Sequence, residues 1–544
     1  MNRSRIPTEI IIILLAAMAY IPFLGSAHLF DWDEINFAES AREMVVSGDY
    51  TFVQINFQPF WEKPPLFIWM QAASMKLFGV NEFAARFPNA LCGILTLLVL
   101  YWIGKREKDE KLGWLWALAY GCSILPFLYF KSGIIDPWFN LFMMLGIYFG
   151  YRYLTDSQQK GLSILLAGVF TGGAMLTKGP VGPLIVGLVG LSFLILNRDR
   201  LFQVRFVDIL LLFVGFVAIG GFWFILQIFQ GRWDVVVDFI EYQIRLFQTK
   251  DAGHGGFPGY HVVVLFIGVF PASIFALGEL LRRDKSGKKA LVQIMKITFW
   301  VVIVLFSIVR TKIVHYSSMC YFPIAFLAAW NIHSMWAKEN SIKVWQKGAL
   351  IFVGGIFITL VGVLFFAEDI QQSLQAADWI QDPFAKGNLE ANGNWKGMEG
   401  VPALFLLGGL TMSLIGWRKN IQPATWVLFF GTALFTLLTV VWVVPRIEEY
   451  SQHSAIEFWK SHAEEDAYAM SVFYKSYAPC FYAKVPAQQD ARAHDVYWLM
   501  TGELDKPAYF ATKIHKKEKL ENLYPQLEFL YSSNGFAFYK RSPN

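Results

Sequence analysis

Charge is scarce in this chain. Only 16% of its 544 residues are charged, whereas 55% are hydrophobic and 17% aromatic. Soluble domains carry about a quarter charged residues. This composition excludes an ordinary soluble protein and predicts a polytopic α-helical membrane protein. The formal net charge of +5 does not indicate a nucleic-acid partner, because the basic residues fall in short segments between hydrophobic runs.

Cysteine is scarce as well. The four cysteines are Cys92, Cys122, Cys320 and Cys480, and their spacing matches neither a metal motif nor a redox motif. Cys480 stands alone in the polar C-terminal part, so no internal disulfide is expected there. The sequence also lacks an HExxH motif, clustered Cys and His, and internal repeats. A required metal cofactor is therefore weakly supported, although a divalent metal stays possible.

Long hydrophobic runs are abundant. The first run could pass for a signal peptide, but we interpret it as an uncleaved helix, because the later spans need an orienting start. About thirteen runs approach the roughly 20 residues that cross a bilayer, and they cover residues 9–27, 83–103, 112–129, 134–153, 161–176, 181–196, 207–229, 261–281, 291–308, 313–332, 348–366, 401–416 and 424–444.

Basic residues indicate the orientation of these spans. With the N-terminus inside, the inner segments carry most of the Lys and Arg, whereas the short outer loops carry only Lys131, Lys178, Arg310 and Lys312. The asymmetry predicts that residues 28–82, 230–260, 367–400 and the C-terminal part lie outside.

The segment from Asp31 to Lys63 follows the first run directly. It places Asp33, Glu34, Glu62 and Lys63 at the mouth of the predicted bundle. Ionisable groups are costly to desolvate there, which makes them candidates for function. For Asp33 and Glu34, solvated surface carboxylates are the alternative interpretation.

The same part of the chain predicts two helices. Asp31 and Glu34 resemble a capping box for an amphipathic helix that ends near Gly48 and lies along the membrane surface. A second helix is expected after Pro64-Pro65, from residue 66 to residue 78.

Composition changes near Pro445. We expect a membrane module over residues 1–445 and a small α/β extracytoplasmic domain over residues 446–544. The pattern predicts helices near 447–460 and 513–522, strands within 467–474 and 507–512, and a hairpin formed by 527–531 and 536–540 around Asn534-Gly535.

Further polar residues stand at the predicted outer ends of spans. Taken singly, each has a structural interpretation: a lysine can snorkel to the interface, an aspartate can cap a helix, and a histidine can be hydrogen-bonded at the interface. Taken together, they predict one outer cavity. They are Asp136, Lys178, Arg245, His254, Lys312, His315 and Tyr316.

This residue set fits phosphate and proton chemistry. Carboxylates can act as a general base or bind a metal, for which Glu62 and His254 are the candidates. Lysine and arginine can hold a phosphate through charge-assisted hydrogen bonds. A cavity that is open to lipid and to the outer side suits a substrate with an isoprenoid tail and a phosphate head.

Several motifs stand in a fixed order along the chain: Asp33-Glu34 after the first span, AREMVVSGDY, WEKPPLFIW, LFGVNEFAARFPNAL, IIDPWFNLF, LTKGP and KIVHYSSMCYFP. Together they resemble the prokaryotic branch of the protein O-mannosyltransferase superfamily, which includes the lipid A aminoarabinose transferases. The resemblance implies a GT-C fold with about 13 transmembrane helices and an outer C-terminal domain. It also implies a sugar donor linked to polyprenyl phosphate.

The resemblance also implies roles for individual residues. Asp33 matches the catalytic carboxylate, Glu34 completes its acidic pair, and Asp136 matches the acid of the second outer loop. Glu62 and Lys63 match a Glu-Lys-Pro motif whose lysine reaches the lipid phosphate. Lys178, Arg245, His254, Lys312, His315 and Tyr316 are expected on the donor side, on weaker grounds.

The chain departs from the aminoarabinose transferases at three positions. Asn36 and Phe37 stand where those enzymes have arginine and tyrosine, and Phe60 stands where they have tyrosine. These differences argue against assigning the chain to that subgroup. Arg245 or Lys178 is expected to supply the missing cation.

We therefore predict an inverting glycosyltransferase of the bacterial inner membrane, with a cytoplasmic N-terminus and a periplasmic C-terminal domain. It moves a hexosyl or pentosyl group from a polyprenyl-phosphate donor to lipid A, a protein or a surface glycan. Two alternatives stay open. One is a transporter or flippase of a lipid-linked sugar, and the other is an oligosaccharide transferase or polymerase.

Overall fold

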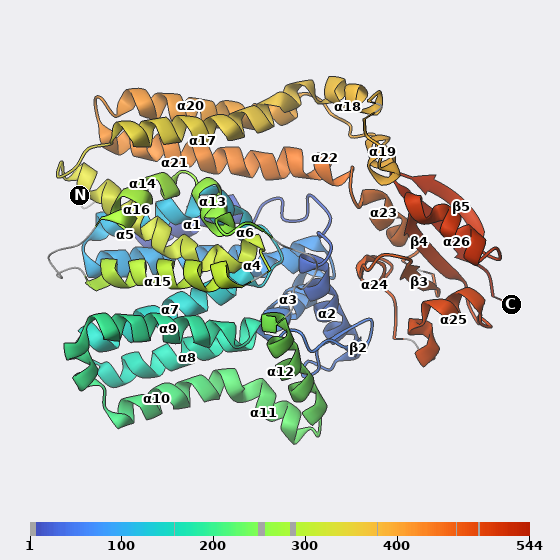
Figure 1. Ribbon diagram of the computed structural model, residues 1–544, viewed down its shortest axis with the longest axis horizontal. Helices are drawn as coiled ribbons and strands as arrows, with labels where there is room; N and C mark the ends of the chain where they lie inside the picture. Colours follow the sequence, from blue (N-terminus) through green and yellow to red (C-terminus); the bar gives the residue numbers. More distant parts are fainter. Residues whose placement is uncertain are drawn as a thin grey trace, which may run out of the picture.

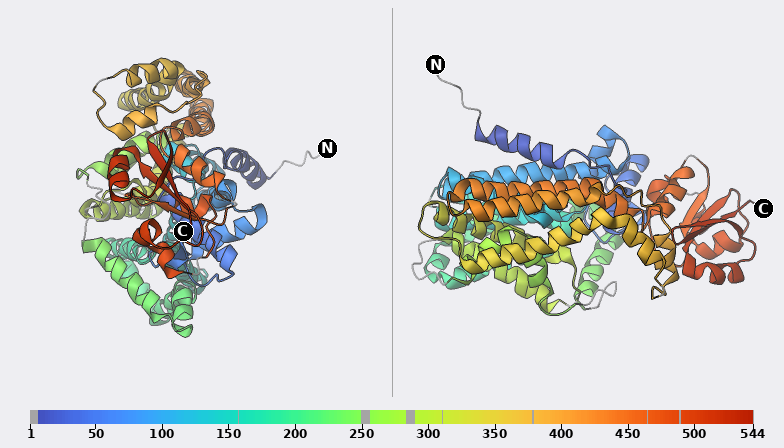
Figure 2. Two further views of the ribbon diagram at one scale, coloured as in Figure 1. Left: turned by 90° about the vertical axis from the view of Figure 1, so that its right-hand side faces the viewer. Right: turned by 90° about the horizontal axis from the view of Figure 1, so that it is seen from above.

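The computed structural model describes residues 7–156, 158–248, 256–282, 290–309, 311–377, 379–463, 465–487 and 490–543. A long bundle of helices carries a small sheet domain at one end (Figures 1 and 2). The helices of the bundle are α1 (Thr8–Tyr20), α4 (Glu82–Glu107), α5 (Glu110–Gly121), α6 (Ile124–Tyr129), α7 (Asp136–Thr155), α8 (Lys160–Lys178), α9 (Val181–Leu196), α10 (Phe206–Phe216), α11 (Phe222–Phe229), α13 (Tyr260–Gly268), α14 (Ala272–Leu281), α15 (Ala290–Ile308), α16 (Tyr321–Trp336), α17 (Val344–Gly362), α20 (Val401–Gly416) and α21 (Ile421–Leu438).

The bundle has the surface of a membrane protein. Large apolar side chains such as Phe213, Phe352 and Leu360 are more than half exposed on its outside, which is the pattern expected where lipid replaces water. Seven helices in the described part of the chain are long and apolar enough to cross a bilayer, and four shorter helices are also apolar. The predicted polytopic α-helical class is confirmed, and the count of about thirteen spans stays a prediction.

Small residues allow the helices to approach closely. A Cβ on Gly104 of α4 would stand 2.6 Å from the Cα of Gly113 on α5. A Cβ on Gly168 of α8 would clash with the carbonyl of Leu212 on α10. Backbone contacts of this kind fix the scaffold from which the outer loops project.

The first outer segment forms α2 (Asp33–Ser47), the short strands β1 (Gln54–Ile55) and β2 (Gln58–Pro59), and α3 (Leu66–Phe78). It lies at the end of the bundle that faces the sheet domain (Figure 1). The C-terminal end of α2 and the N-terminal end of α3 agree with the sequence prediction. Gly48 ends α2 in the left-handed conformation, at φ 74°, and α3 follows the proline pair.

The prediction of a surface-lying amphipathic α2 was wrong, because the polar face of this helix is buried. Arg42 donates to Glu39 at 2.6 and 2.7 Å and to the carbonyl of Val485, in the C-terminal part, at 2.9 Å. Glu43 accepts from the backbone N–H of Phe57 at 2.9 Å. Burial, together with the neighbouring Glu39, raises the pKa of Glu43 to about 9. The segments around Phe57 and Val485 cover this face. Folding brings them beside α2, so the local sequence of the helix does not reveal them.

The predicted capping box was wrong as well. Trp32 occupies the N-cap position at φ 73°, and among the described residues no side chain caps this end. Asp31 instead accepts from the N–H of Trp32 at 2.9 Å. The carboxylate of Glu34 does reach back to a backbone N–H, but the donor is Phe30, at 2.9 Å.

The C-terminal part combines helices with a four-stranded sheet. The strand order is β3-β4-β6-β5, in which β3 runs parallel to β4 and the other pairs are antiparallel. Its elements are α22 (Val444–Glu448), α23 (His453–Ser461), β3 (Tyr468–Ser471), α24 (Ala478–Tyr482), α25 (Val496–Thr501), β4 (Ala508–Lys513), α26 (Lys517–Leu523), β5 (Glu528–Ser533) and β6 (Phe536–Arg541).

The predicted hairpin is present in this sheet. Asn534 and Gly535 join β5 to β6 with φ angles of 46° and 79°, as expected for a turn that needs two left-handed residues. The domain boundary between residues 445 and 446 stays a prediction. The remaining outer elements are α12 (Trp233–Gln248), the short 3₁₀ segment η3 (Val314–Cys320), α18 (Ala367–Gln375) and α19 (Pro383–Leu389).

Candidate functional site

Asp33 stands at the first position of α2 and points to a histidine that is distant in sequence. Its Oδ2 lies 2.9 Å from Nε2 of His315 on η3. Nδ1 of His315 lies 2.8 Å from the hydroxyl of Tyr129 at the end of α6. The Asp33 side chain is 59% exposed, whereas that of His315 is 24% exposed. The structure thus presents an accessible carboxylate on a hydrogen-bonded support.

The electrostatics of this pair favour charge on both members. Burial acts to raise the pKa of Asp33, but the hydrogen bond and charge of His315, with Lys178 and Lys63, hold that pKa below its ordinary value. Burial acts to lower the pKa of His315, but Asp33 and Asp136 hold it above its ordinary value. Near neutral pH, Asp33 is therefore an ionised carboxylate that can accept a proton.

A second ion pair joins the outer ends of two helices. Nζ of Lys178, the last residue of α8, lies 2.6 Å from Oδ1 of Asp136, the first residue of α7. The side chains are 16% and 5% exposed. The ammonium also lies 5.6 Å from the centroid of the Phe139 ring. Among the described residues no side chain caps the start of α7, so Asp136 pairs with Lys178 and does not serve as an N-cap.

Lys63 and Glu62 meet α12. The hydroxyl of Tyr242 donates to Oε2 of Glu62 at 3.1 Å, and Nζ of Lys63 lies 5.1 Å from the Tyr242 ring centroid. Arg245, one turn further along α12, lies 5.2 Å from the same ring. Tyr242 thus organises an acid and two cations around one aromatic ring.

Lys63 links these groups into one site. Burial lowers its pKa, the charge of Glu62 opposes that shift, and Lys178, Asp136 and Asp33 also act on it. The structure therefore brings Asp33, His315, Asp136, Lys178, Glu62 and Lys63 together, from positions that range over most of the membrane module.

The carboxylate of Glu34 is buried and paired with an arginine, whereas that of its neighbour Asp33 is exposed. The Glu34 carboxylate accepts from Nε and NH2 of Arg86 at 2.8 and 2.7 Å, from the N–H of Phe30, and from the N–H of Gly133 at 2.5 Å. The side chains of Glu34 and Arg86 are 3% and 6% exposed. Burial acts to raise the pKa of Glu34, but Arg86 holds it below its ordinary value. This geometry favours a positioning role for Glu34.

Lys312 and Tyr316 are engaged with the end of α15. Nζ of Lys312 donates to the carbonyls of Phe306, Ser307 and Val309 at 2.8, 2.8 and 2.6 Å, so this lysine closes a helix C-terminus. Tyr316 packs on Phe306, with ring centroids 5.1 Å apart. These contacts favour structural roles for both residues.

His254, which was predicted on the donor side and as a metal candidate with Glu62, lies outside the described residues. Glu62 itself is bonded to Tyr242.

Sequence reasoning missed Tyr129, Tyr242 and Arg86. Tyr242 carried a readable signal, because it precedes the predicted Arg245 by one helical turn and both then share a face. Tyr129 and Arg86 lie within otherwise apolar or helical runs, and their partners are far away in sequence.

The departures at Asn36 and Phe37 fall on buried positions of α2. Phe37 packs edge-on against Phe67, with ring centroids 5.9 Å apart. The Oδ1 atom of Asn36 is buried and has no partner among the described residues.

Comparisons with known proteins agree with this architecture. A family model described as dolichyl-phosphate-mannose-protein mannosyltransferase matches residues 62–223. The undecaprenyl phosphate-alpha-4-amino-4-deoxy-L-arabinose arabinosyl transferase of Shewanella sediminis is 26% identical over 442 residues, which cover 77% of each chain. An Aquifex aeolicus protein is 26% identical and covers 66% of this chain and 70% of its own length.

The fold also matches a solved structure. The crystal structure of ArnT from Cupriavidus metallidurans bound to undecaprenyl phosphate superposes with a TM-score of 0.78, covering 98% of this chain and 99% of that one at 19% identity. The fold is therefore that of the GT-C membrane glycosyltransferases.

Together, the sequence matches and this fold support a GT-C glycosyltransferase of the superfamily that includes the protein O-mannosyltransferases and the aminoarabinose transferases. The predicted family, fold class and enzyme class, a membrane glycosyltransferase, are confirmed.

Proposed function

We propose that the chain is an inverting glycosyltransferase that uses a polyprenyl-phosphate sugar. The observation that carries the proposal is the exposed Asp33 carboxylate, held ionised 2.9 Å from His315 beside Lys63 and Lys178. Such a site offers a base and a phosphate-binding group within one outer cavity. The similarity to transferases named for undecaprenyl phosphate substrates supports this choice of donor.

The reaction follows from these groups. An acceptor hydroxyl attacks the anomeric carbon of the donor from the side opposite the phosphate, and Asp33 takes the hydroxyl proton. A new glycosidic C–O bond forms while the bond from the sugar to the lipid phosphate breaks with its electron pair on the phosphate. The departing polyprenyl phosphate is an anion, so it needs no general acid.

Cations stabilise that leaving anion. Lys63 lies beside Tyr242, and Arg245 lies near the same ring. Lys178 approaches from the Asp136 pair. Preorganised positive charge aimed at the developing phosphate is the main catalytic contribution expected here. His315, supported by Tyr129, positions the base Asp33.

The setting of the reaction belongs to the same proposal. The loop charges support a bacterial inner membrane protein with a cytoplasmic N-terminus and a periplasmic domain over residues 446–544. The acceptor is then a periplasmic hydroxyl or phosphate on lipid A, a protein or a surface glycan.

Purified protein would be incubated with radiolabelled polyprenyl-phosphate sugars and with extracted membrane lipids or glycoproteins, with and without EDTA. Transfer of label to an acceptor is expected. The EDTA arm shows whether a metal ion contributes to the reaction. Movement of labelled donor across reconstituted vesicles without transfer would favour a flippase, and a need for a diphosphate donor would favour an oligosaccharide transferase or polymerase.

A further inference from the structure

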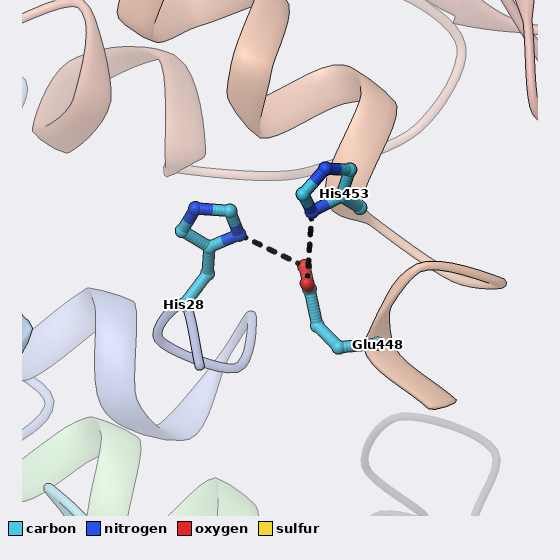
Figure 3. Close-up of side chains that lie close together, drawn as sticks. All are labelled: His28, Glu448 and His453. Carbon is cyan, nitrogen blue, oxygen red and sulfur yellow. Dashed lines mark hydrogen bonds and ion pairs between the residues drawn. The ribbon is translucent and has the colours of Figure 1, made fainter. Parts of the chain in front are cut away.

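A second cluster of ionisable groups lies apart from the residues assigned to glycosyl transfer. It consists of His28 from the loop before α2, Glu448 at the end of α22, and His453 at the start of α23. Nδ1 of His28 lies 3.2 Å from one carboxylate oxygen of Glu448, and Nδ1 of His453 lies 3.1 Å from the other. Both imidazole rings point at this carboxylate (Figure 3).

We propose that these three side chains bind a divalent cation of the zinc class. Two imidazole nitrogens and one carboxylate oxygen form a donor set that zinc prefers. Zinc bonds of 2.0–2.1 Å in tetrahedral geometry place donor atoms about 3.3 Å apart. Each histidine nitrogen lies 3.1–3.2 Å from a different oxygen of the Glu448 carboxylate, and one donor atom from each of the three residues lies within 4.8 Å of the others.

The surroundings of His28 also suit a metal ligand. Its Nδ1 faces Glu448, while its Nε2 lies 3.2 Å from Oε1 of Glu457. A histidine that binds a metal through one nitrogen commonly donates its other N–H to a carboxylate, which fixes the tautomer and the ring. Nζ of Lys460 lies 2.7 Å from Oε1 of Glu457 and offsets its charge. The same Nζ lies 3.4 Å from Nε2 of His28.

The cluster is also partly accessible to solvent, so a cation can reach it. The side chain of Glu448 is 3% exposed, that of His28 13% and that of His453 36%. The carboxylate is therefore shielded, while the cation can enter and keep a water ligand on the His453 side. Three protein ligands with a fourth open position satisfy tetrahedral zinc.

Such a cation would join the C-terminal domain to the catalytic loop. The segment after His28 is already held by that domain: Gln452 donates to the carbonyl of Leu29 at 2.8 Å and accepts from the N–H of Asp31 at 3.2 Å, and the hydroxyl of Tyr482 accepts from the N–H of Leu29 at 2.8 Å. The chain then leads directly to Asp33. The proposed ion thus links the two parts of the chain, and it fixes the segment that carries the base.

The test measures metal binding and does not depend on transferase activity. Full-length protein in detergent would be stripped with EDTA, dialysed, and titrated with zinc against a chromogenic chelator, with bound zinc counted by mass spectrometry. Stoichiometric zinc binding is expected, together with a higher unfolding temperature when zinc is added, because the ion binds only the folded state. Visible bands of tetrahedral cobalt should appear when Co²⁺ replaces zinc.

Variants locate the ion. His28→Ala and His453→Asn should lose the stoichiometric zinc, and Glu457→Gln should weaken zinc binding about 10–100-fold by releasing the ring of His28. The matched control is His462→Asn, which removes another histidine paired with a carboxylate, Glu465, at 2.8 Å and should leave binding unchanged. Because His453 is partly exposed, its variant should stay folded, which size-exclusion chromatography would check.

Two outcomes would overturn the proposal. If the wild type binds no more zinc than a His28→Ala, His453→Asn double variant, the cluster is only a network of ion pairs. If zinc is lost in Glu62→Gln but kept in His28→Ala, the ion binds at the transferase site instead.

Discussion

Two neighbouring carboxylates on α2 should respond to mutation in opposite ways. Glu34→Gln removes the buried charge that faces Arg86, whereas Asp33→Asn removes the exposed charge that faces His315. Both substitutions keep the side-chain size and delete one negative charge. The pair is therefore a matched test of which carboxylate supports the fold and which supports the reaction.

The magnitudes follow from burial. Glu34 and Arg86 are 3% and 6% exposed and share two short hydrogen bonds. Breaking a buried ion pair by removing one partner typically costs about 3–5 kcal/mol, because the remaining charge is buried without compensation. Asp33 is 59% exposed, so losing its pair with His315 should cost about 0–1 kcal/mol of stability.

Tryptophan fluorescence during heating in detergent, with the half-life at a fixed temperature, gives the apparent stability of each variant. Glu34→Gln should unfold at a clearly lower temperature than the wild type, and Asp33→Asn should unfold close to it. Transferase activity, measured below both transitions, should be lost in Asp33→Asn. Equal unfolding temperatures for Glu34→Gln and the wild type would refute the assignment of Glu34 to the fold.

The remaining predictions concern the charged side chains of Asp33, His315 and Lys63. His315→Gln removes the imidazolium that holds down the pKa of Asp33, so the acidic limb of kcat/KM against pH should move to higher pH; an unmoved limb would argue against the pair. Lys63→Ala should mainly raise the half-saturating donor concentration, and a donor curve identical to that of the wild type would remove this lysine from phosphate binding. The stability that the Asp33–His315 pair contributes should be present above the unfolded pKa of Asp, about 3.9, and below that of His, about 6.5. It should fade as the pH falls through the lowered pKa of Asp33 or rises through the raised pKa of His315, so the difference in unfolding temperature between wild type and Asp33→Asn should shrink on either side.

Local rules predicted several elements well. The proline pair before α3 and Gly48 after α2 set helix ends through backbone geometry alone, and the structure has both. Asn534-Gly535 predicted a tight hairpin for the same reason. Such features depend on residues adjacent in sequence, so no knowledge of the fold is needed to predict them.

Long-range partners could not be predicted in this way. His315 reaches Asp33 across 282 residues, and Arg86 reaches Glu34 across 52. The sequence predicted an amphipathic helix lying along the membrane surface, yet other parts of the fold bury Glu39, Arg42 and Glu43 of α2. The same limit hid the His28, Glu448 and His453 cluster, because His28 stands near the start of the chain and the other two residues stand more than 400 positions later, in the C-terminal part.

Asp33 is proposed as the base of glycosyl transfer, and single-turnover kinetics of purified protein test this role. Wild type and Asp33→Asn, both confirmed to be folded, would be compared in transfer from a radiolabelled polyprenyl-phosphate sugar at saturating donor. Transfer is expected from the wild type, and none above background from the variant. Turnover by Asp33→Asn at the wild-type rate would show that Asp33 is not the base.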